Sequence, residues 1–166
     1  MTRRKKGWLI TAGVALAVFG YVGFRFGPDA YVAYKNGLFE KQQKHNYRSD
    51  DTENLKAMLA ALMLYHESEG QFPVASGWMD AIESRIKTND LADGQAIKKL
   101  QRPGAAAGEY GYALNTAFGG KYIDDVKDQT QPLIYVSKQK SRNAAGDPKV
   151  DRSGMGITVK GEIQGQ

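Results

Sequence analysis

The chain has 166 residues and no cysteine, which suits one domain with an extension and excludes a disulfide framework or a thiolate nucleophile. Its formal net charge of +5 comes largely from Arg3, Arg4, Lys5 and Lys6. Because the other basic residues form no stripe interleaved with aromatic side chains, we expect no nucleic-acid partner.

Residues 1–7 form a basic tail, and the stretch that follows predicts a transmembrane helix over residues 8–26. No charged residue occurs from Trp8 to Phe24. The length of this stretch is near the short end of the ~17–25 residues that a spanning helix needs. Trp8 at one end and Tyr21 and Phe24 at the other are the expected membrane-interface anchors. A cleavable signal peptide is the alternative, but the stretch ends in Phe-Arg-Phe-Gly-Pro, which lacks a small-x-small cleavage site. We expect an uncleaved, single-pass anchor in the lipid bilayer.

The charges that flank this stretch predict its orientation. The basic cluster before Trp8 favours an N-terminus on the inner side of the membrane. Basic residues also follow the stretch, but they are dilute and mixed with Asp29 and Glu40. We therefore expect the chain in the cytoplasmic (inner) membrane, with its C-terminal domain in the periplasm.

Small residues lie on one face of the predicted span. Gly13, Ala17 and Gly20 have the spacing that lets two helices approach closely, so they are a candidate partner-helix seam. Glycine and alanine are also common in membrane helices without such a role. The sequence leaves both interpretations open.

Residues 27–50 are predicted to form a helical stalk or linker. Gly27 and Pro28 mark a break at its start. A thin apolar stripe, which includes Tyr31 and Leu38, runs among lysines and glutamines. This stripe can lie on the membrane surface or against a neighbour, or the segment can be a solvated stalk, and we weigh these equally.

A long helix is predicted to organise the outer domain, residues 51–166. Asp50 is a candidate N-cap with Glu53 three residues later, which resembles a capping box. Gly70 supplies a left-handed stop, and Phe72-Pro73 prevents continuation. The helix therefore ends close to Gly70.

This helix is apolar nearly all round. The stripe of Leu55, Leu59 and Leu62 has the spacing of one buried face and is expected to lie on a sheet. The opposite stripe is Ala57, Ala61 and Leu64. A helix apolar on both sides is covered on both sides, so this stripe should face either the short helix that contains Trp78 or a partner protein.

The rest of the chain predicts an α+β domain. Ser76 can cap a short helix in which Trp78, Ile82 and Ile86 share a face, and another short helix is expected at about residues 95–101. Alternating or apolar runs predict three strands, at residues 109–115, 131–137 and 155–160. Their spacing suits hairpins, so we expect a small antiparallel sheet that covers the long helix.

The pattern resembles type IV pilins and type II secretion pseudopilins. The features that carry the resemblance are the basic tail, the apolar stretch with Pro28 after it, and a helix end that reads Ala60-Ala-Leu-Met-Leu-Tyr65 and leads into Gly70-Gln-Phe-Pro73. The small sheet, with Tyr112-Ala-Leu-Asn115 and Pro132-Leu-Ile-Tyr-Val136, adds to it. The resemblance implies a pilin-like fold across nearly the whole chain.

The processing site departs from that family. The resemblance implies a glycine followed by Phe-Thr-Leu-Ile-Glu, where a peptidase cuts after the glycine and the glutamate sets subunit register. Here Gly7 is followed by Trp8, and Ala12 stands at the glutamate position. We therefore expect the mature protein to keep its basic tail, and this departure speaks against polymerisation into a filament.

Candidate chemistry is sparse, and we expect no enzyme, no cofactor and no metal site. His45 and His66 lack metal-ligand spacing, and His66 suits a packed position better than a ligand. Glu67 and Glu69 point to different faces and do not suit acid–base work. A minor alternative is calcium held by loop aspartates, which would draw on Asp124, Asp125, Asp128, Asp147 and Asp151.

These observations favour a non-catalytic accessory subunit that stabilises a larger membrane protein complex through an uncleaved pilin-like scaffold. The complex could be respiratory, photosynthetic or a transporter, and its partners would be integral membrane subunits. The alternative is a pilin or pseudopilin subunit of a type IV pilus or type II secretion system. An enzyme or a domain that binds a small-molecule substrate is the weakest alternative.

Overall fold

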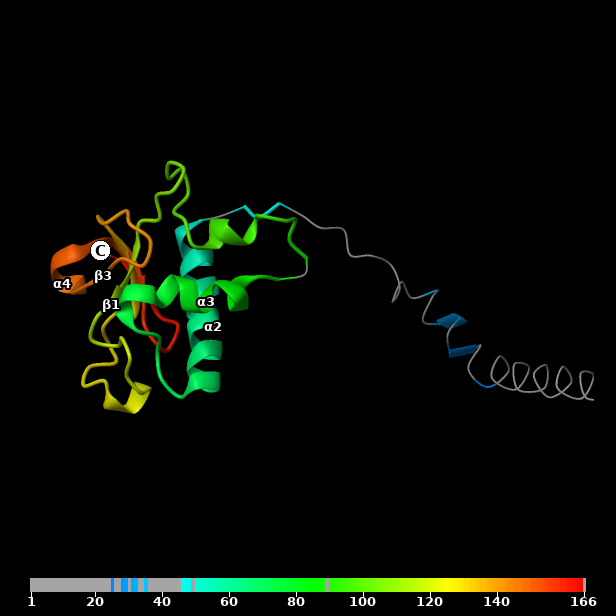
Figure 1. Cartoon of the computed structure of the whole chain (residues 1–166), viewed down its shortest axis with the longest axis horizontal. Helices are drawn as coiled ribbons and strands as arrows, with labels where there is room; N and C mark the ends of the chain where they lie inside the picture. Colours follow the sequence, from blue (N-terminus) through cyan, green and yellow to red (C-terminus); the bar gives the residue numbers. More distant parts are fainter. Residues whose placement is uncertain are drawn as a thin grey trace, which may run out of the picture. The chain divides into compact units, whose positions relative to one another are not determined.

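The computed structural model of the chain describes residues 25, 28, 29, 31, 32, 35, 46–48, 50–88 and 90–165. The chain divides into two compact units, Met1–Gln43 and Lys44–Gln166. In the first unit every described residue is helical and exposed. The second unit contains the elements shown with labels in Figure 1.

The prediction of a single-pass membrane protein requires a correction. Among the residues described, no helix has both the length and the apolar character needed to cross a membrane. Helix α2, Asp51–Glu69, has 19 residues, but charged residues stand in its first and last turns. The predicted segment 8–26 lies outside the described residues apart from Arg25, and so do the predicted seam (Gly13, Ala17, Gly20) and interface anchors (Trp8, Tyr21, Phe24).

Helix α2 begins and ends where its capping residues predict. The Asp50 carboxylate accepts a hydrogen bond from the Glu53 backbone N–H at 2.8 Å. At the other end Gly70 has φ +79°, and its N–H donates to the His66 carbonyl at 2.8 Å. Both contacts satisfy backbone groups that a helix end leaves without partners.

The buried face of α2 differs in one position from the predicted stripe. Leu55 and Leu62 are fully buried as expected, but Met58 takes the central place and Leu59 is only partly buried. This face packs on strands β2, Ile134–Ser137, and β4, Arg152–Ile157. Helix α3, Trp78–Ile86, crosses α2 (Figure 1) and packs against it.

Helix α3 is capped from a distant part of the chain. Ser76 lies in the short 3-10 turn η1, Ala75–Gly77, and makes no capping hydrogen bond. The side-chain oxygen of Asn143 instead accepts hydrogen bonds from the backbone N–H groups of Met79, at 2.8 Å, and Asp80, at 3.3 Å. The predicted Ser76 cap is therefore wrong, because a tertiary contact occupies the helix start.

The sheet is mixed and has five strands, in the order β3-β1-β2-β4-β5. The predicted strands correspond to β1 (Tyr112–Asn115), β2 and β4, which pair antiparallel. The two edge strands β3, Ala145–Gly146, and β5, Ile163–Gln164, were not predicted. Because β3 runs parallel to β1, the prediction of a purely antiparallel sheet is wrong. A two-residue strand has too few side chains to show an alternating pattern.

The two faces of the sheet belong to separate cores. The larger core joins α2 and α3 to the face of the sheet that carries Tyr112, Leu114 and Ile134. A smaller cluster on the other face contains Ala113, Tyr135 and Ala144. The remaining elements are the 3-10 turns η2, Ala96–Lys99, and η3, Ile123–Asp125, and the short helix α4, Pro148–Asp151.

Candidate functional site

The three residues predicted to face a partner occupy three different environments. Ala61 is 1% exposed and belongs to the core that also contains Ile82 and Ile86 of α3. Ala57 is half-buried, whereas Leu64 is 51% exposed. The chain therefore covers Ala61 itself, and only Leu64 lies on open surface.

An outer ridge of α2, defined here as Ala60, Met63 and Leu64, is apolar and faces outward. Ala60 and Leu64 are exposed and Met63 is half-buried. Lys56 and Glu67, both exposed, border the ridge along the helix. Residues four apart on a helix lie on the same side, so Ala60 and Leu64 form one continuous surface between two opposite charges.

His66 has a structural role at the end of the same helix. Its Nε2 accepts a hydrogen bond from the Ile123 backbone N–H at 3.2 Å, and its ring lies 4.8 Å from that of Phe72. The segment of Phe72 is joined to that of Lys121 by a backbone hydrogen bond of 2.9 Å. His66 thus binds the first residue of η3 to the end of helix α2, as expected for a packed histidine. His45 lies outside the described residues.

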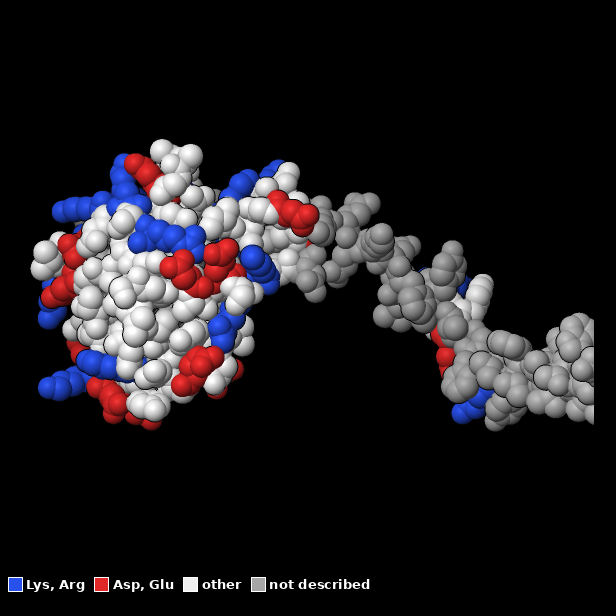
Figure 2. Space-filling model, in the orientation of Figure 1, with Lys and Arg blue, Asp and Glu red and all other residues white. Residues whose placement is uncertain are grey.

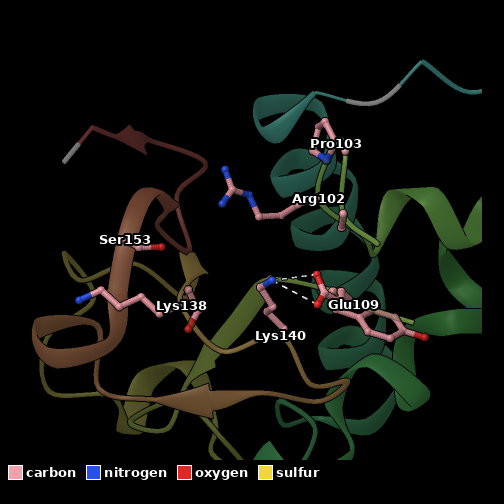
Figure 3. A pocket seen from close by; sticks show the side chains of 11 residues that line it. Arg102, Pro103, Glu109, Lys138, Lys140 and Ser153 are labelled. Carbon is pink, nitrogen blue, oxygen red and sulfur yellow. Dashed lines mark hydrogen bonds and ion pairs between the residues drawn. The ribbon is translucent and has the colours of Figure 1, made fainter. Parts of the chain in front are cut away.

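A cationic cleft lies where the loop after η2 meets the ends of β2 and β4. The cleft has a volume of about 360 Å³, and its charged lining residues are Arg102, Glu109, Lys138 and Lys140. Figure 3 shows Arg102 extending toward the side where Ser153 lies, with Lys138 and Lys140 on separate parts of the rim. Sequence analysis missed this site, because its residues come from four separate segments and form no motif.

Arg102 is held in place from both ends. Its backbone N–H donates to the Tyr110 carbonyl at 2.9 Å, and its Nε and Nη2 donate to the Asp51 carboxylate at 3.3 and 3.0 Å. Gly111 makes room for the Arg102 stem, since a Cβ at this position would lie 2.7 Å from Arg102 Cδ. Gly111 also has φ +79°, which favours glycine.

A buried polar network lies behind Arg102. Tyr112 donates its hydroxyl to Asp51 at 2.7 Å, and fully buried Asn54 donates to the Tyr112 hydroxyl at 3.1 Å. Burial, followed by the hydrogen bond to the Asp51 carboxylate, raises the pKa of Tyr112 well above its ordinary value. The Tyr112 hydroxyl therefore stays protonated and orients Asp51 toward Arg102.

The two lysines of the cleft differ in their partners. Lys140 Nζ lies 3.0 Å from Glu109 Oε2 and is 68% exposed. Lys138 is exposed on the rim, and its ammonium group has no ion-pair partner among the described residues. The lining thus contains three cations and one carboxylate.

This positive cleft stands on a body with almost no net charge. Residues 46–166 contain 15 lysines and arginines and 16 aspartates and glutamates, a net charge of −1. In Figure 2, basic side chains gather at the upper left edge of this body, whereas both signs are interspersed elsewhere on the visible face. The lining of the cleft therefore has a more positive charge than the body as a whole.

The structure shows other contacts for two of the aspartates that were candidate calcium ligands. In the described part of the chain, no group of three or more histidine, aspartate or glutamate side chains is placed to hold a metal ion. Asp128 accepts from the Thr130 hydroxyl and from Gln131, and these contacts lower its pKa below the ordinary value. Asp147 caps α4 by accepting from the Lys149 backbone N–H at 2.9 Å. These two aspartates thus stabilise local turns.

Comparison of the chain with protein-family models, curated proteins and solved structures found no match. The structure is α+β, with helices packed on a five-strand mixed sheet.

Proposed function

We propose that residues 44–166 form a non-catalytic, protein-binding domain of pilin-like design that serves as an accessory subunit of a larger protein complex. The observation that carries this proposal is the outer ridge of α2. Leu64 exposes half of its side chain on a helix whose other long apolar residues are largely buried. Covering such a side chain in an interface contributes about 1 kcal/mol or more.

The shape and charges of the outer ridge favour a helix as the partner element. Ala60 is small, so a second helix can approach the α2 backbone closely beside the larger Leu64. Lys56 and Glu67 would lie at opposite ends of the contact, where they can set its direction through charge. The packing of α2 on β2 and β4 supports the pilin-like design, in which one long helix backs a small sheet.

The acidic side chains of the domain support a structural role. Asp51 binds Arg102 and Tyr112. Asp80 and Glu83 both bind Arg142, each at 2.6 Å. These carboxylates connect segments that are separate in the sequence, as contacts in a structural protein do.

The test is affinity purification of the full chain from its native source, compared for two variants. Leu64→Lys places a charge on the outer ridge, and Val150→Lys does the same at Val150 of α4, which is 73% exposed. We expect Leu64→Lys to reduce co-purification of partner proteins about tenfold or more, because a buried charge is costly, and Val150→Lys to leave it unchanged. Equal recovery of partners with both variants would contradict the proposal.

A photo-crosslinker at Leu64 distinguishes the accessory subunit from the alternative, a pilin or pseudopilin subunit. Crosslinks to a different protein support the accessory subunit. Crosslinks only to a second copy of the chain would favour a polymerising subunit.

A further inference from the structure

We propose that the cationic cleft binds an acidic peptide segment of a partner protein through Arg102, Lys138 and Lys140. This surface is separate from the outer ridge of α2, so the inference does not depend on the contact at Leu64. It names a second contact and the chemistry that the contact recognises.

The cleft contains cationic groups that can still bind an anion. Asp51 takes up Nε and Nη2 of Arg102, which leaves the Nη1 amino group, and Arg102 is 41% exposed. Lys138 contributes a whole charge that no described residue neutralises. Asp51 and Glu109 pair with Arg102 and Lys140, so the charge of Lys138 remains and an incoming carboxylate meets a rim of positive net charge.

The spacing of the cations favours a peptide over a single small anion. Arg102 follows η2, whereas Lys138 and Lys140 follow β2, so the charges come from two sides of the cleft (Figure 3). With its fork engaged by Asp51, Arg102 offers one amino group instead of the bidentate pair that suits a phosphate. Successive carboxylates along an extended chain can reach each cation separately.

The lining does not suit a nucleotide. Tyr110, the aromatic residue of the lining, is 9% exposed. Its ring faces the Arg142 guanidinium at 5.4 Å, and its hydroxyl accepts from Arg142 at 2.9 Å. A base therefore has no free ring in the lining on which to stack.

Glu109 holds Lys140 at the mouth and thus occupies part of the proposed site. An acidic ligand would have to compete with Glu109 for this ammonium group. Removing the Glu109 charge should therefore strengthen binding, a direction that loss of a purely structural ion pair would not produce.

The test is fluorescence anisotropy of labelled hexaglutamate with the full-length chain at low ionic strength, where charge contacts are least screened. We expect Lys138→Glu to weaken binding roughly tenfold and Glu109→Gln to strengthen it several-fold. Lys160→Glu changes an exposed lysine that does not line the cleft and should leave the affinity unchanged. Circular dichroism checks that each variant remains folded.

Two results would overturn the inference. Equal weakening by Lys138→Glu and Lys160→Glu, or no binding at all, would mean that the cleft is not a site for acidic peptides. In the second case, binding of inorganic pyrophosphate measured by isothermal titration calorimetry would assign the cleft to a small anion. Neither result bears on crosslinking at Leu64, so failure here is separable from failure of the proposed function.

Discussion

Asn143 combines a backbone conformation and a capping contact in one residue. Its φ of 57° makes it the one non-glycine residue with positive φ in the described part of the chain. Its oxygen caps α3, and its Nδ2 donates to the Asp80 carboxylate at 2.6 Å. This hydrogen bond, followed by the one from Arg142, lowers the pKa of Asp80 below its ordinary value. Asparagine suits the position because its short amide tolerates the left-handed region.

Replacing Asn143 separates these two contributions. Asn143→Ala loses the cap and places a Cβ-bearing residue without a compensating amide at positive φ, so we expect a loss of about 2 kcal/mol in the free energy of unfolding. Asn143→Gly also loses the cap but relieves the backbone strain, and should cost about 1 kcal/mol. Urea denaturation of both variants measures the difference. If the alanine variant were as stable as the glycine variant, the inference that positive φ at residue 143 strains an alanine would be wrong.

At the scale of elements, the sequence predicted the features that depend on contacts between residues close together in the chain. The caps of α2 at Asp50 and Gly70 could be predicted because each depends on residues one turn away. The start of α3 could not, since its cap comes from Asn143, which is 64 residues distant from Met79. The parallel edge strand β3 has the same origin, because its pairing with β1 depends on the path of the chain through η3, β2 and the loop after β2.

The candidate sites follow the same rule. The helical pattern placed Leu64 in one stripe with Ala57 and Ala61, but of these three residues only Leu64 is exposed in the structure. Ala61 could not be assigned to α3 or to a partner, since the sequence contains the stripe but not the element that covers it. The cationic cleft required the fold itself, which brings Arg102 and Lys138 from distant segments to one rim.

A prediction at the scale of elements compares two leucines of helix α2, Leu62 and Leu59. Leu62 is fully buried in the core, whereas Leu59 lies at its edge, where a Cβ on Gly161 would be 3.8 Å from Leu59 Cδ2. Leu62→Ala should lower the free energy of unfolding by about 2–5 kcal/mol because it leaves a cavity. Leu59→Ala should cost only about 1 kcal/mol, since solvent already reaches part of the side chain. Chemical denaturation tests the order, and a larger effect at Leu59 would contradict this account of the buried face.

At the scale of the whole molecule, charge and packing divide the chain at nearly the same place. Residues 1–45 contain eight basic and two acidic residues, a net charge of +6, whereas residues 46–166 have a net charge of −1. The boundary between the compact units falls after Gln43. The positive net charge of the full chain therefore says little about the surface of the folded body, and arguments about partners have to start from local sites such as the cleft.

Tyr47 connects the start of the second unit to its core. Its hydroxyl donates to the buried Asn54 oxygen at 2.9 Å, and Lys99 Nζ lies 5.5 Å from the centre of its ring. Burial, with smaller contributions from Glu53 and Asp50, raises the pKa of Tyr47 to about 12, so the hydroxyl remains a donor at neutral pH. Asn54 in turn donates to the Gln101 carbonyl at 2.7 Å, which connects Tyr47 through Asn54 to the segment that follows η2.

We therefore predict that a fragment of residues 44–166 folds with the same free energy of unfolding as residues 44–166 within the full chain. A fragment of residues 50–166 should be less stable by about 1–3 kcal/mol, because it loses one hydrogen bond to a buried group and one cation–π contact. Tyr47→Phe in the longer fragment keeps the ring and removes the hydroxyl, and should account for about 1 kcal/mol of this loss. Thermal and urea unfolding of the three proteins provide the comparison. Failure of residues 44–166 to unfold cooperatively would show that the folded body depends on the preceding residues. Equal stability of the two fragments would show that the contacts of Tyr47 do not stabilise the fold.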